Sequence, residues 1–439
     1  MRRAIRAAVA LVAWIALGAP LSSGDDVAAR VEQLSKQVGP TVVQWRRDFH
    51  AHPELANREE RTARVVAERL REMGVDQIKT GVAHHGVVAL IRGGKPGPTV
   101  ALRADMDALP VQERTNLPFA SQNNGVMHAC GHDAHTAMLL GAAKVLVQVR
   151  ESIPGNVKLI FQPAEEGTPP GEEGGAKLMI QEGVLGDPEV SAIFGLHVNT
   201  ELETSKLGYR QGALLASVDR FRITVSGKQS HAAMPWKGID PIVASAQIIT
   251  AIQTIASRKI DARRPVVVSI GIIRAGTAWN IIPEQVTMEG TIRTHQTEVR
   301  KQATEELQRL VRQTASAHGA TAEIVLDDYG PAVWNDPELG GRMKASLVAA
   351  AGEKNVVESE PVMGGEDFAQ YAQKVPGFYF FLGVRNESIG AVHAAHTPDF
   401  LIDEAALPLG VRALALLAVD YLRAEPGGVG KPRPTQPTP

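Results

Sequence analysis

The chain has 439 residues, more than one hydrophobic core usually supports, so its length predicts two domains. Its composition is that of an ordinary globular protein, with 44% hydrophobic residues, 21% charged residues and a formal net charge of −2. The 46 basic residues are balanced by 48 acidic ones, which gives no basic field for nucleic acid. These values exclude nucleic acid as the partner and favour a small molecule.

The first 24 residues differ from the rest of the chain. Arg2, Arg3 and Arg6 precede an apolar run over residues 7–19, and small residues follow at 22–24. This order is typical of a secretory signal peptide, and the run is shorter than the roughly 20 apolar residues that span a bilayer. The sequence therefore predicts an exported protein, periplasmic or secreted, with no stable membrane span.

Residues 25–215 are predicted to begin a larger domain of the α/β class. Amphipathic helical spacing comes first, and short apolar runs that indicate buried strands then alternate with helical segments. The predicted helices are 27–49, 59–73 and 136–149, and the predicted strands are 86–91, 99–103, 157–161 and 192–197.

Residues 216–327 show a different pattern, βαββαβ, which is that of a ferredoxin-like unit. Its predicted elements are strand 220–226, helix 241–257, strands 266–274 and 285–294, helix 298–318 and strand 322–327. The apolar run 377–383 resembles the earlier sheet again, so the small unit is predicted to be inserted into the larger domain, which resumes over 328–424. Residues 425–439 are rich in Pro and Gly and are predicted to form a disordered tail. The cleft between the two domains is the expected ligand site.

A thiol and several imidazoles crowd into residues 127–135, just before a predicted helix. Soft sulfur together with imidazole suits zinc or a similar transition metal. Cys130 is the only cysteine and cannot form an internal disulfide. His132 and His135 lie about one helical turn apart and could face one site, but Cys130 with His132 is an equally possible pair. Spacing alone leaves both pairs open.

Two adjacent carboxylates, Glu165 and Glu166, follow the predicted strand 157–161 directly. Open α/β sheets carry their ligands at the carboxyl ends of their strands. One Glu could bind a metal while its neighbour acts as general base. The alternative for this pair is a solvated acidic turn.

Further candidates stand at His197, which ends an apolar run, and at His396, which lies in a loop of small residues. Each could be a metal ligand or a structural histidine. Asp105 and Asp107 follow a predicted strand and alternate, so both point to the same side if the chain stays extended. One of them could orient a ligand histidine.

Seven motifs, in unbroken order, together resemble the M20 metallopeptidase family, and most closely its amidohydrolase branch. That branch includes hippurate hydrolases, N-acyl-amino-acid amidohydrolases and plant auxin-conjugate hydrolases. The resemblance covers residues 28–420 and implies a mixed-sheet catalytic domain with an inserted ferredoxin-like lid that also forms a homodimer. The motifs are residues 47–54, 104–110, 127–135, 161–167, 196–198, 364–368 and 396–398.

The resemblance also implies two divalent metal ions per subunit, for which zinc, manganese, cobalt and nickel all suit the ligands. Glu165 would be the general base. A thiolate between two cations stays deprotonated, which would explain the single unpaired cysteine. The ligands implied are Cys130 as the bridge, with His132, Glu166, His197 and His396.

The resemblance further implies a lid histidine that reaches the other subunit's active site and stabilises the oxyanion; residues 227–235 match that motif and make His231 the candidate. Asn280 and Arg293 match family positions that grip the substrate carboxylate, a task suited to the planar guanidinium group. Gln229 and Ala395 depart from residues that are frequent in this branch. These two departures leave the substrate preference and the lid flexibility open.

The predicted function is the hydrolysis of N-acyl amino acids, hippurate-like or related conjugates, to a carboxylic acid and a free amino acid. The metals would polarise the amide carbonyl, and Glu165 would take a proton from the attacking water and deliver it to the leaving amine. Three alternatives remain: Cys130 as a nucleophile, a peptide as the substrate of a carboxypeptidase or dipeptidase, and a binding protein without catalysis.

Overall fold

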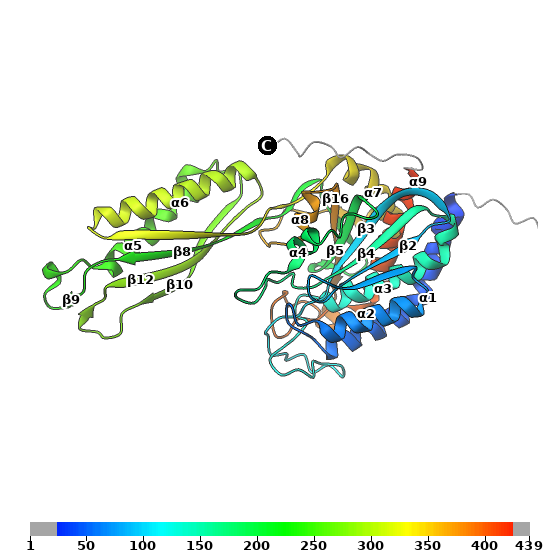
Figure 1. Cartoon of the computed structure of the whole chain (residues 1–439), viewed down its shortest axis with the longest axis horizontal. Coiled ribbons are helices and arrows are strands. Elements are labelled where there is room, and N and C mark those ends of the chain that lie inside the picture. The colour runs from blue at the N-terminus through cyan, green and yellow to red at the C-terminus, as the bar shows by residue number, and fades with distance from the viewer. Residues whose placement is uncertain (1–23, 425–439) are drawn as a thin grey trace, which may run out of the picture.

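The computed structural model describes residues 24–424 of the chain. The tail predicted for residues 425–439 lies outside the described residues, as does the predicted signal peptide apart from Gly24, which begins helix α1. Figure 1 shows a larger unit and an elongated smaller unit that extends from one side of it.

The larger unit is built on a mixed eight-stranded sheet with the strand order β1-β2-β4-β3-β5-β16-β6-β15. The central strands β4, β3, β5 and β16 run parallel, whereas β1 and β2 form an antiparallel edge. Both faces of these central strands are covered, so most of their residues are buried and many are apolar. The strands are β1 Gln77–Val82, β2 Gly86–Arg92, β3 Lys95–Asp105, β4 Pro154–Gln162, β5 Val190–Glu203, β6 Leu207–Tyr209, β15 Val356–Glu358 and β16 Gly377–Arg385.

Helices cover both faces of this sheet. Successive side chains of β3 alternate between two cores: Val100 and Leu102 pack under the larger helical layer, and Ala101 packs under the smaller one. The larger layer contains α1 Gly24–Ala51, α2 Glu60–Glu72, α3 His132–Val149, α7 Pro337–Ala351 and α9 Leu407–Ala424. The smaller layer contains α4 Gly175–Gln181 and α8 Phe368–Ala372, beside the paired strands β7 Gly212–Leu215 and β14 Val333–Asn335.

Helix α9 and the turn before it are long and apolar enough to pass a length-and-composition test for a membrane span. Within the described residues this is the only such helix, and 72% of its apolar window is buried inside the molecule. It packs against α1, α3 and α7 and is a core helix of the larger unit.

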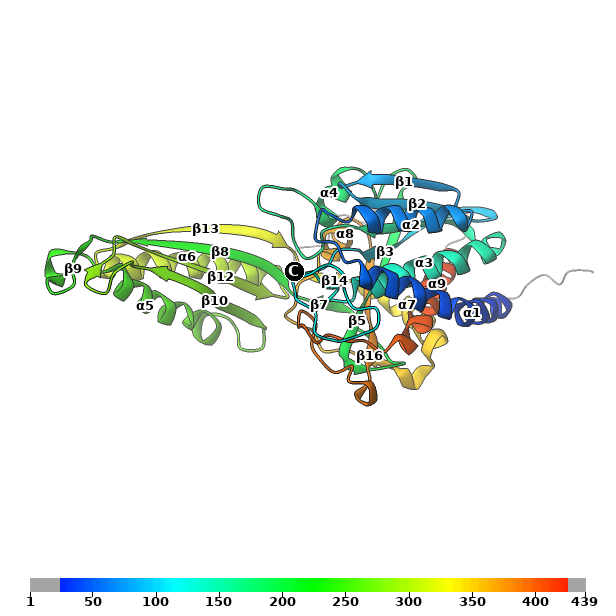
Figure 2. The same ribbon diagram turned by 90° about the horizontal axis from the view of Figure 1, so that it is seen from below.

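The smaller unit has its own four-stranded antiparallel sheet, in the order β10-β12-β8-β13, and its own apolar core. Helices α5 and α6 lie on one face of this sheet, and the other face is open (Figures 1 and 2). The elements are β8 Ser217–Ser226, α5 Pro241–Ile252, β10 Val266–Ala275, β12 Gln285–Thr294, α6 Thr297–Ala317 and β13 Thr321–Gly330, and two short strands, β9 Ser230–His231 and β11 Ile281–Ile282, pair with each other.

These observations confirm the predicted fold class, an α/β protein with a mixed sheet and a separate antiparallel βαββαβ unit. The largest difference in a helix boundary concerns the predicted helix 241–257. In the structure α5 ends at Ile252, and the wider π-helical turn Ile255–Lys259 follows it. Apolar spacing continues through both segments, so periodicity alone does not reveal the change of helix type.

Candidate active site

The candidate residues come from the ends of neighbouring elements. The end of β3 and the loops after β3 and β4 supply carboxylates, and β5 supplies a histidine. The turn before α3 supplies the cysteine, the first residue of α3 is a histidine, and the loop before α9 supplies the last histidine. The carboxyl ends of parallel strands meet at one edge of a sheet, where such a cluster can assemble. In chain order these residues are Asp105, Asp107, Cys130, His132, Glu165, Glu166, His197 and His396.

Four of these side chains converge on the thiol of Cys130. The Sγ atom of Cys130 lies 3.3 Å from Nε2 of His197 and 3.3 Å from Nε2 of His396. Oε1 of Glu166 lies 3.1 Å from Nε2 of His396 and 3.9 Å from Nε2 of His132. Two sets of potential ligands therefore share the sulfur: Cys130, His132 and His197 in one, and Cys130, Glu166 and His396 in the other.

The chemistry of this cluster suits two cations. Nε2 of His132 is buried without a hydrogen-bond partner among the described residues, an arrangement that is costly unless a ligand occupies it. Burial raises the pKa of the Cys130 thiol well above its usual range, and the Glu166 carboxylate adds to this effect, so a thiolate here needs positive charge beside it. Burial lowers the pKa of His197 to about 3, which keeps that imidazole neutral and able to bind a metal.

Asp107 orients two of the candidate ligands. Its backbone oxygen lies 2.9 Å and its Oδ1 atom 3.2 Å from Nδ1 of His132, which leaves Nε2 of that ring directed at the cluster. Its Oδ2 atom accepts a hydrogen bond of 2.9 Å from the backbone N–H of Glu166. A carboxylate behind a histidine fixes the tautomer and the ring orientation.

The structure gives His135 a supporting position. Its Nδ1 atom lies 2.6 Å from Oδ1 of Asp105, and its Nε2 atom accepts a hydrogen bond of 2.9 Å from the backbone N–H of Val198. Both ring nitrogens are therefore engaged. This favours the pair of Cys130 with His132 over the pair of His132 with His135.

The backbone around the cluster adopts conformations that most residues avoid. Gly131, immediately before α3, has φ of 96°, and a Cβ atom there would lie 2.4 Å from Cγ2 of Val198. Ala164 and His396 have positive φ values of 55° and 66°. Such strained residues concentrate at functional sites, where surrounding contacts hold them in place.

Sequence reasoning missed a buried charged network behind the cluster. Arg103 pairs with Asp105 at 2.7 Å, with Glu366 at 2.9 Å and with Asp367 at 2.8 Å, and the Tyr379 hydroxyl donates to Glu366 at 2.6 Å. A motif over residues 364–368 contributed to the family resemblance, but it carried no predicted role. The network joins strands that are distant in sequence, so no local spacing could reveal it.

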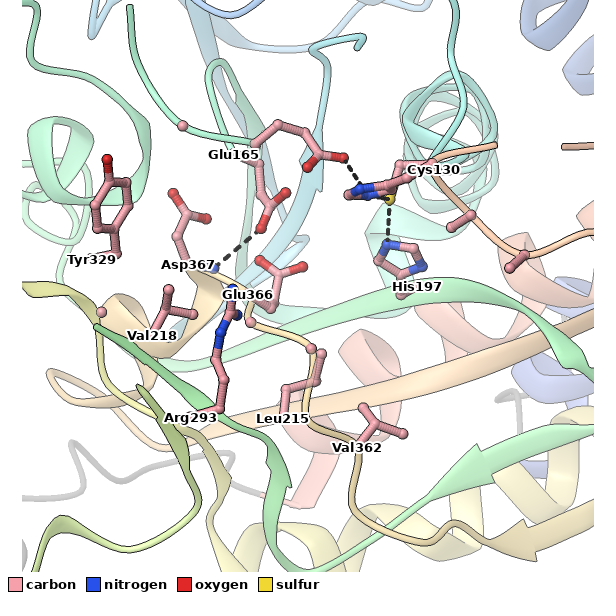
Figure 3. A pocket seen from close by; sticks show the side chains of 18 of the residues that line it. Cys130, Glu165, His197, Leu215, Val218, Arg293, Tyr329, Val362, Glu366 and Asp367 are labelled. Atoms are coloured by element: carbon pink, nitrogen blue, oxygen red, sulfur yellow. Dashed lines mark hydrogen bonds and ion pairs between the residues drawn. The ribbon is translucent and has the colours of Figure 1, made fainter. Parts of the chain in front are cut away.

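Glu165 lies between this network and the potential metal ligands. Its Oε1 atom accepts a hydrogen bond of 3.3 Å from the backbone N–H of Asp367 (Figure 3). Burial and then the negative charges of Glu366 and Glu166 raise the pKa of the Glu165 carboxyl well above its usual range. Cations bound beside it would oppose this shift, and the balance of the two effects suits a group that accepts and returns a proton.

A cleft of about 710 Å³ extends from the cluster to the base of the smaller unit. Arg293 on β12 lines this cleft, and its Nε donates a hydrogen bond of 3.0 Å to Thr291. No ion pair joins Arg293 to a carboxylate among residues 24–424, although the other cleft-lining arginine, Arg220, pairs with Glu289. Figure 3 shows the side chain of Arg293 directed toward Glu366. A half-buried, unpaired guanidinium group is suited to bind a carboxylate.

His231 and Asn280 lie elsewhere in the smaller unit. His231 pairs with Ile281 between β9 and β11, and Asn280 accepts a hydrogen bond of 2.9 Å from the backbone N–H of Ala232. Between Gln285 and Arg293, β12 extends roughly 26 Å at ~3.3 Å per residue. Figure 1 shows β9 at the end of the smaller unit far from the larger one. Within one chain, His231 and Asn280 are therefore not brought together with Arg293 or with the ligand cluster.

Comparison with known proteins gives consistent matches. The model of Peptidase family M20/M25/M40 matches residues 101–420. Thermostable carboxypeptidase 1 of Saccharolobus solfataricus is 44% identical over 90% of this chain and 99% of its own length, and an N-acetylcysteine deacetylase of Bacillus subtilis is 43% identical over 87% and 97%. A Bacillus subtilis structure, described as a dinuclear metal-binding peptidase of the M20 family, is 41% identical with a TM-score of 0.75, over 88% of this chain and 99% of its own.

The comparisons contradict the predicted export. The match to the carboxypeptidase covers 398 residues and 99% of that protein. The match to the deacetylase covers 382 residues and 97% of that protein. Neither match supports a signal peptide. The described residues supply none either, because the predicted signal peptide falls almost entirely outside them. The prediction of a periplasmic or secreted protein is therefore withdrawn, and no compartment is assigned.

Proposed function

The chain belongs to Peptidase family M20/M25/M40, and we propose that it hydrolyses the amide bond of small N-acyl amino acids to a carboxylic acid and a free amino acid. The observation that carries this proposal is the pair of ligand sets that share Cys130, next to Glu165 and at one end of a cleft that Arg293 also lines. The names of the relatives, a deacetylase and a carboxypeptidase, agree with amide-bond chemistry.

We propose that the two ligand sets that share Cys130 would hold two divalent cations, with zinc, manganese, cobalt and nickel as the candidates. His132 and His197 would complete one site, and Glu166 and His396 the other. When bound, the cations polarise the amide carbonyl and lower the pKa of an attacking water. Asp107 keeps His132 and Glu166 in position for this role.

Glu165 is the proposed general base. Its carboxylate is oriented by the backbone N–H of Asp367 and borders the ligand cluster. It accepts a proton from the attacking water and then delivers that proton to the departing amine. The negative charge of Glu366 favours proton uptake by Glu165 during the first step.

The two sides of the cleft suit the two halves of the substrate. Arg293 would hold the carboxylate of the amino acid. The side chains of Leu215, Val362 and Phe381 offer an apolar wall for a hippurate-like acyl group. Figure 3 shows Leu215 and Val362 on one side of Arg293.

We also propose a homodimer formed through the smaller unit, residues 216–327, which would act as a lid. His231 is exposed, with Asn280 beside it. In such a dimer, His231 would reach the active site of the second copy. The same unit exposes large apolar side chains, with Trp279 at 94%, Trp236 at 75% and Ile273 at 53% exposure. Apolar surface of this kind marks an interaction site.

One experiment separates this function from its rivals. Hippurate, N-acetyl amino acids, indole-acetyl amino acids and dipeptides are offered to the protein before chelation, after chelation and after metal restoration. Loss of turnover on chelation with recovery on metal addition supports the proposal, and turnover that survives chelation supports Cys130 as a nucleophile. Ligand binding without product under any metal supports a binding protein.

The Glu165→Gln variant tests the assigned base. We expect it to retain both metal ions, as measured by elemental analysis, and to lose turnover by at least about a hundredfold. Near-normal turnover would overturn the assignment.

A peptide substrate is the second candidate, favoured by the carboxypeptidase relative and by Arg293. A free C-terminal carboxylate on a dipeptide offers Arg293 the same partner as an N-acyl amino acid does. The dipeptides in the panel decide between the two substrate classes through their relative kcat/KM values.

A further inference from the structure

The open face of the smaller sheet carries a row of arginines that leads away from the cleft. On β8, Phe221, Ile223 and Val225 face the helices, so Arg220 and Arg222 face the opposite side. The register between β8 and β12 places Arg293 opposite Val218, Thr291 opposite Arg220, and Glu289 opposite Arg222. Arg220 and Arg293 are therefore diagonal neighbours on the same face, with Cβ atoms ~7 Å apart.

The charges on this face do not cancel. Glu289 is shared by three arginines: it pairs with Arg220, lies 3.8 Å from Arg222 and lies 3.4 Å from Arg274. Asp327 stands opposite Arg220 on β13, but no ion pair joins these two residues within the described chain. Glu323 also lies on this face of β13, opposite Thr224. With the unpaired Arg293 included, four guanidinium groups therefore face three carboxylates.

Arg220 also reaches the cleft itself. Arg220, Thr291 and Tyr329 line the same cleft as Arg293 and the ligand cluster, whereas Arg222 and Arg274 do not. Arg220 bonds to Glu289 through Nη2 and also to the Tyr329 hydroxyl, so others of its five N–H donors remain for a ligand. Figure 3 shows Val218 and Tyr329 on one side of Arg293, opposite the apolar side chains of Leu215 and Val362.

We propose that Arg220, with the Tyr329 hydroxyl beside it, forms a second carboxylate-binding subsite. This subsite would select N-acyl amino acids with an acidic side chain, N-acyl-glutamate above all. This inference rests on the proposed function. With the α-carboxylate of the substrate on Arg293 and the acyl group on the apolar wall, the amino-acid side chain extends toward Arg220. A carboxylate at its end meets a guanidinium group there, and a neutral amide of the same shape loses that charge-assisted bond.

The test compares N-acetyl-L-glutamate with N-acetyl-L-glutamine, which have the same shape and differ in charge. We expect the metal-loaded protein to favour the glutamate compound about tenfold in kcat/KM, mainly through KM because Arg220 is remote from the reacting bond. The Arg220→Gln variant is expected to bring this ratio close to one. The matched control is Arg222→Gln, which removes a positive charge from the same face and a neighbour of the same Glu289 but leaves the cleft lining intact. This control is expected to keep the preference for the glutamate compound.

A wild-type ratio near one, or a ratio that survives Arg220→Gln, overturns the subsite even if other N-acyl amino acids are cleaved. A binding measurement separates failure of the subsite from failure of the proposed function. The two compounds are titrated calorimetrically into metal-loaded Glu165→Gln and into the double variant with Arg220→Gln. Tighter glutamate binding that disappears in the double variant supports the subsite even without turnover, and equal or absent binding overturns it.

Discussion

Replacing Gly131 by alanine should damage both the stability of the larger unit and the affinity for metal. An alanine at φ of 96° costs about 1–2 kcal/mol in backbone strain. Its Cβ atom would also lie 2.4 Å from Cγ2 of Val198, closer than real carbon atoms approach, and overpacking of this kind costs a further ~1–3 kcal/mol. The displaced Val198 follows His197 directly, so we expect the ligand cluster to lose metal affinity as well.

Gly125 provides the matched control. It also has a left-handed backbone, with φ of 76°, but nothing lies within 4 Å of its Cβ position. Gly125→Ala should therefore show the strain of about 1–2 kcal/mol alone. Urea denaturation of the metal-free variants, followed by circular dichroism, measures the stability, and competition with a chelator measures the metal affinity. Equal losses in both variants, with equal metal affinity, would show that Val198 yields to the methyl group and would refute the steric reasoning.

Three further outcomes are expected. Asp107→Asn should weaken metal binding about 10–100-fold in a chelator competition, because a carboxylate no longer supports His132; unchanged affinity would remove Asp107 from this role. Arg293→Lys should raise KM for N-acyl amino acids about tenfold and spare KM for their carboxamide analogues, because lysine lacks the planar fork; equal effects on both would contradict carboxylate binding. Burial lowers the pKa of His128 to about 4. Between pH 6.5 and pH 4 this histidine is therefore protonated in the unfolded protein but stays neutral in the folded protein. The metal-free protein should lose about 3 kcal/mol of its free energy of unfolding from this group as the pH falls over that range. His128→Leu should flatten that part of the stability profile, and an unchanged slope in pH-dependent denaturation would assign it to other groups.

Local apolar periodicity was sufficient to predict the long helices and strands of this fold. Helix α6 and strand β12 carry regular apolar spacing over their whole length, and the predicted ranges 298–318 and 285–294 match them closely. Short strands were missed because three or four residues contain too little pattern; β6 and β15 are three residues each and depend on pairing with distant strands. Tertiary contact, rather than local propensity, determines such elements.

The candidate site was likewise predicted from the sequence only in part. Sequence spacing brought Cys130, His132 and Glu166 forward as candidates but could not choose between His132 and His135. That choice depends on the hydrogen bonds of His135 to Asp105 and to the backbone of Val198, which only the fold creates. Charge networks that join distant strands leave no trace in local order, so the acidic cluster around Arg103 was not predicted.

The position of Arg293 links the two units in a way that bears on catalysis. The smaller unit joins the larger one through the start of β8 and the end of β13, and Arg293 lies at that same end of β12, beside the Gly364–Gly365 turn. A Cβ atom on Gly365 would lie 2.2 Å from Val218 and 3.1 Å from Nη1 of Arg293, so this close approach depends on glycine. The next residues of the turn are Glu366 and Asp367, which contact Arg103 and Glu165. A rotation of the smaller unit about this junction would therefore move the proposed carboxylate anchor relative to the proposed base, so the position of the smaller unit would be coupled to the alignment of the amide bond.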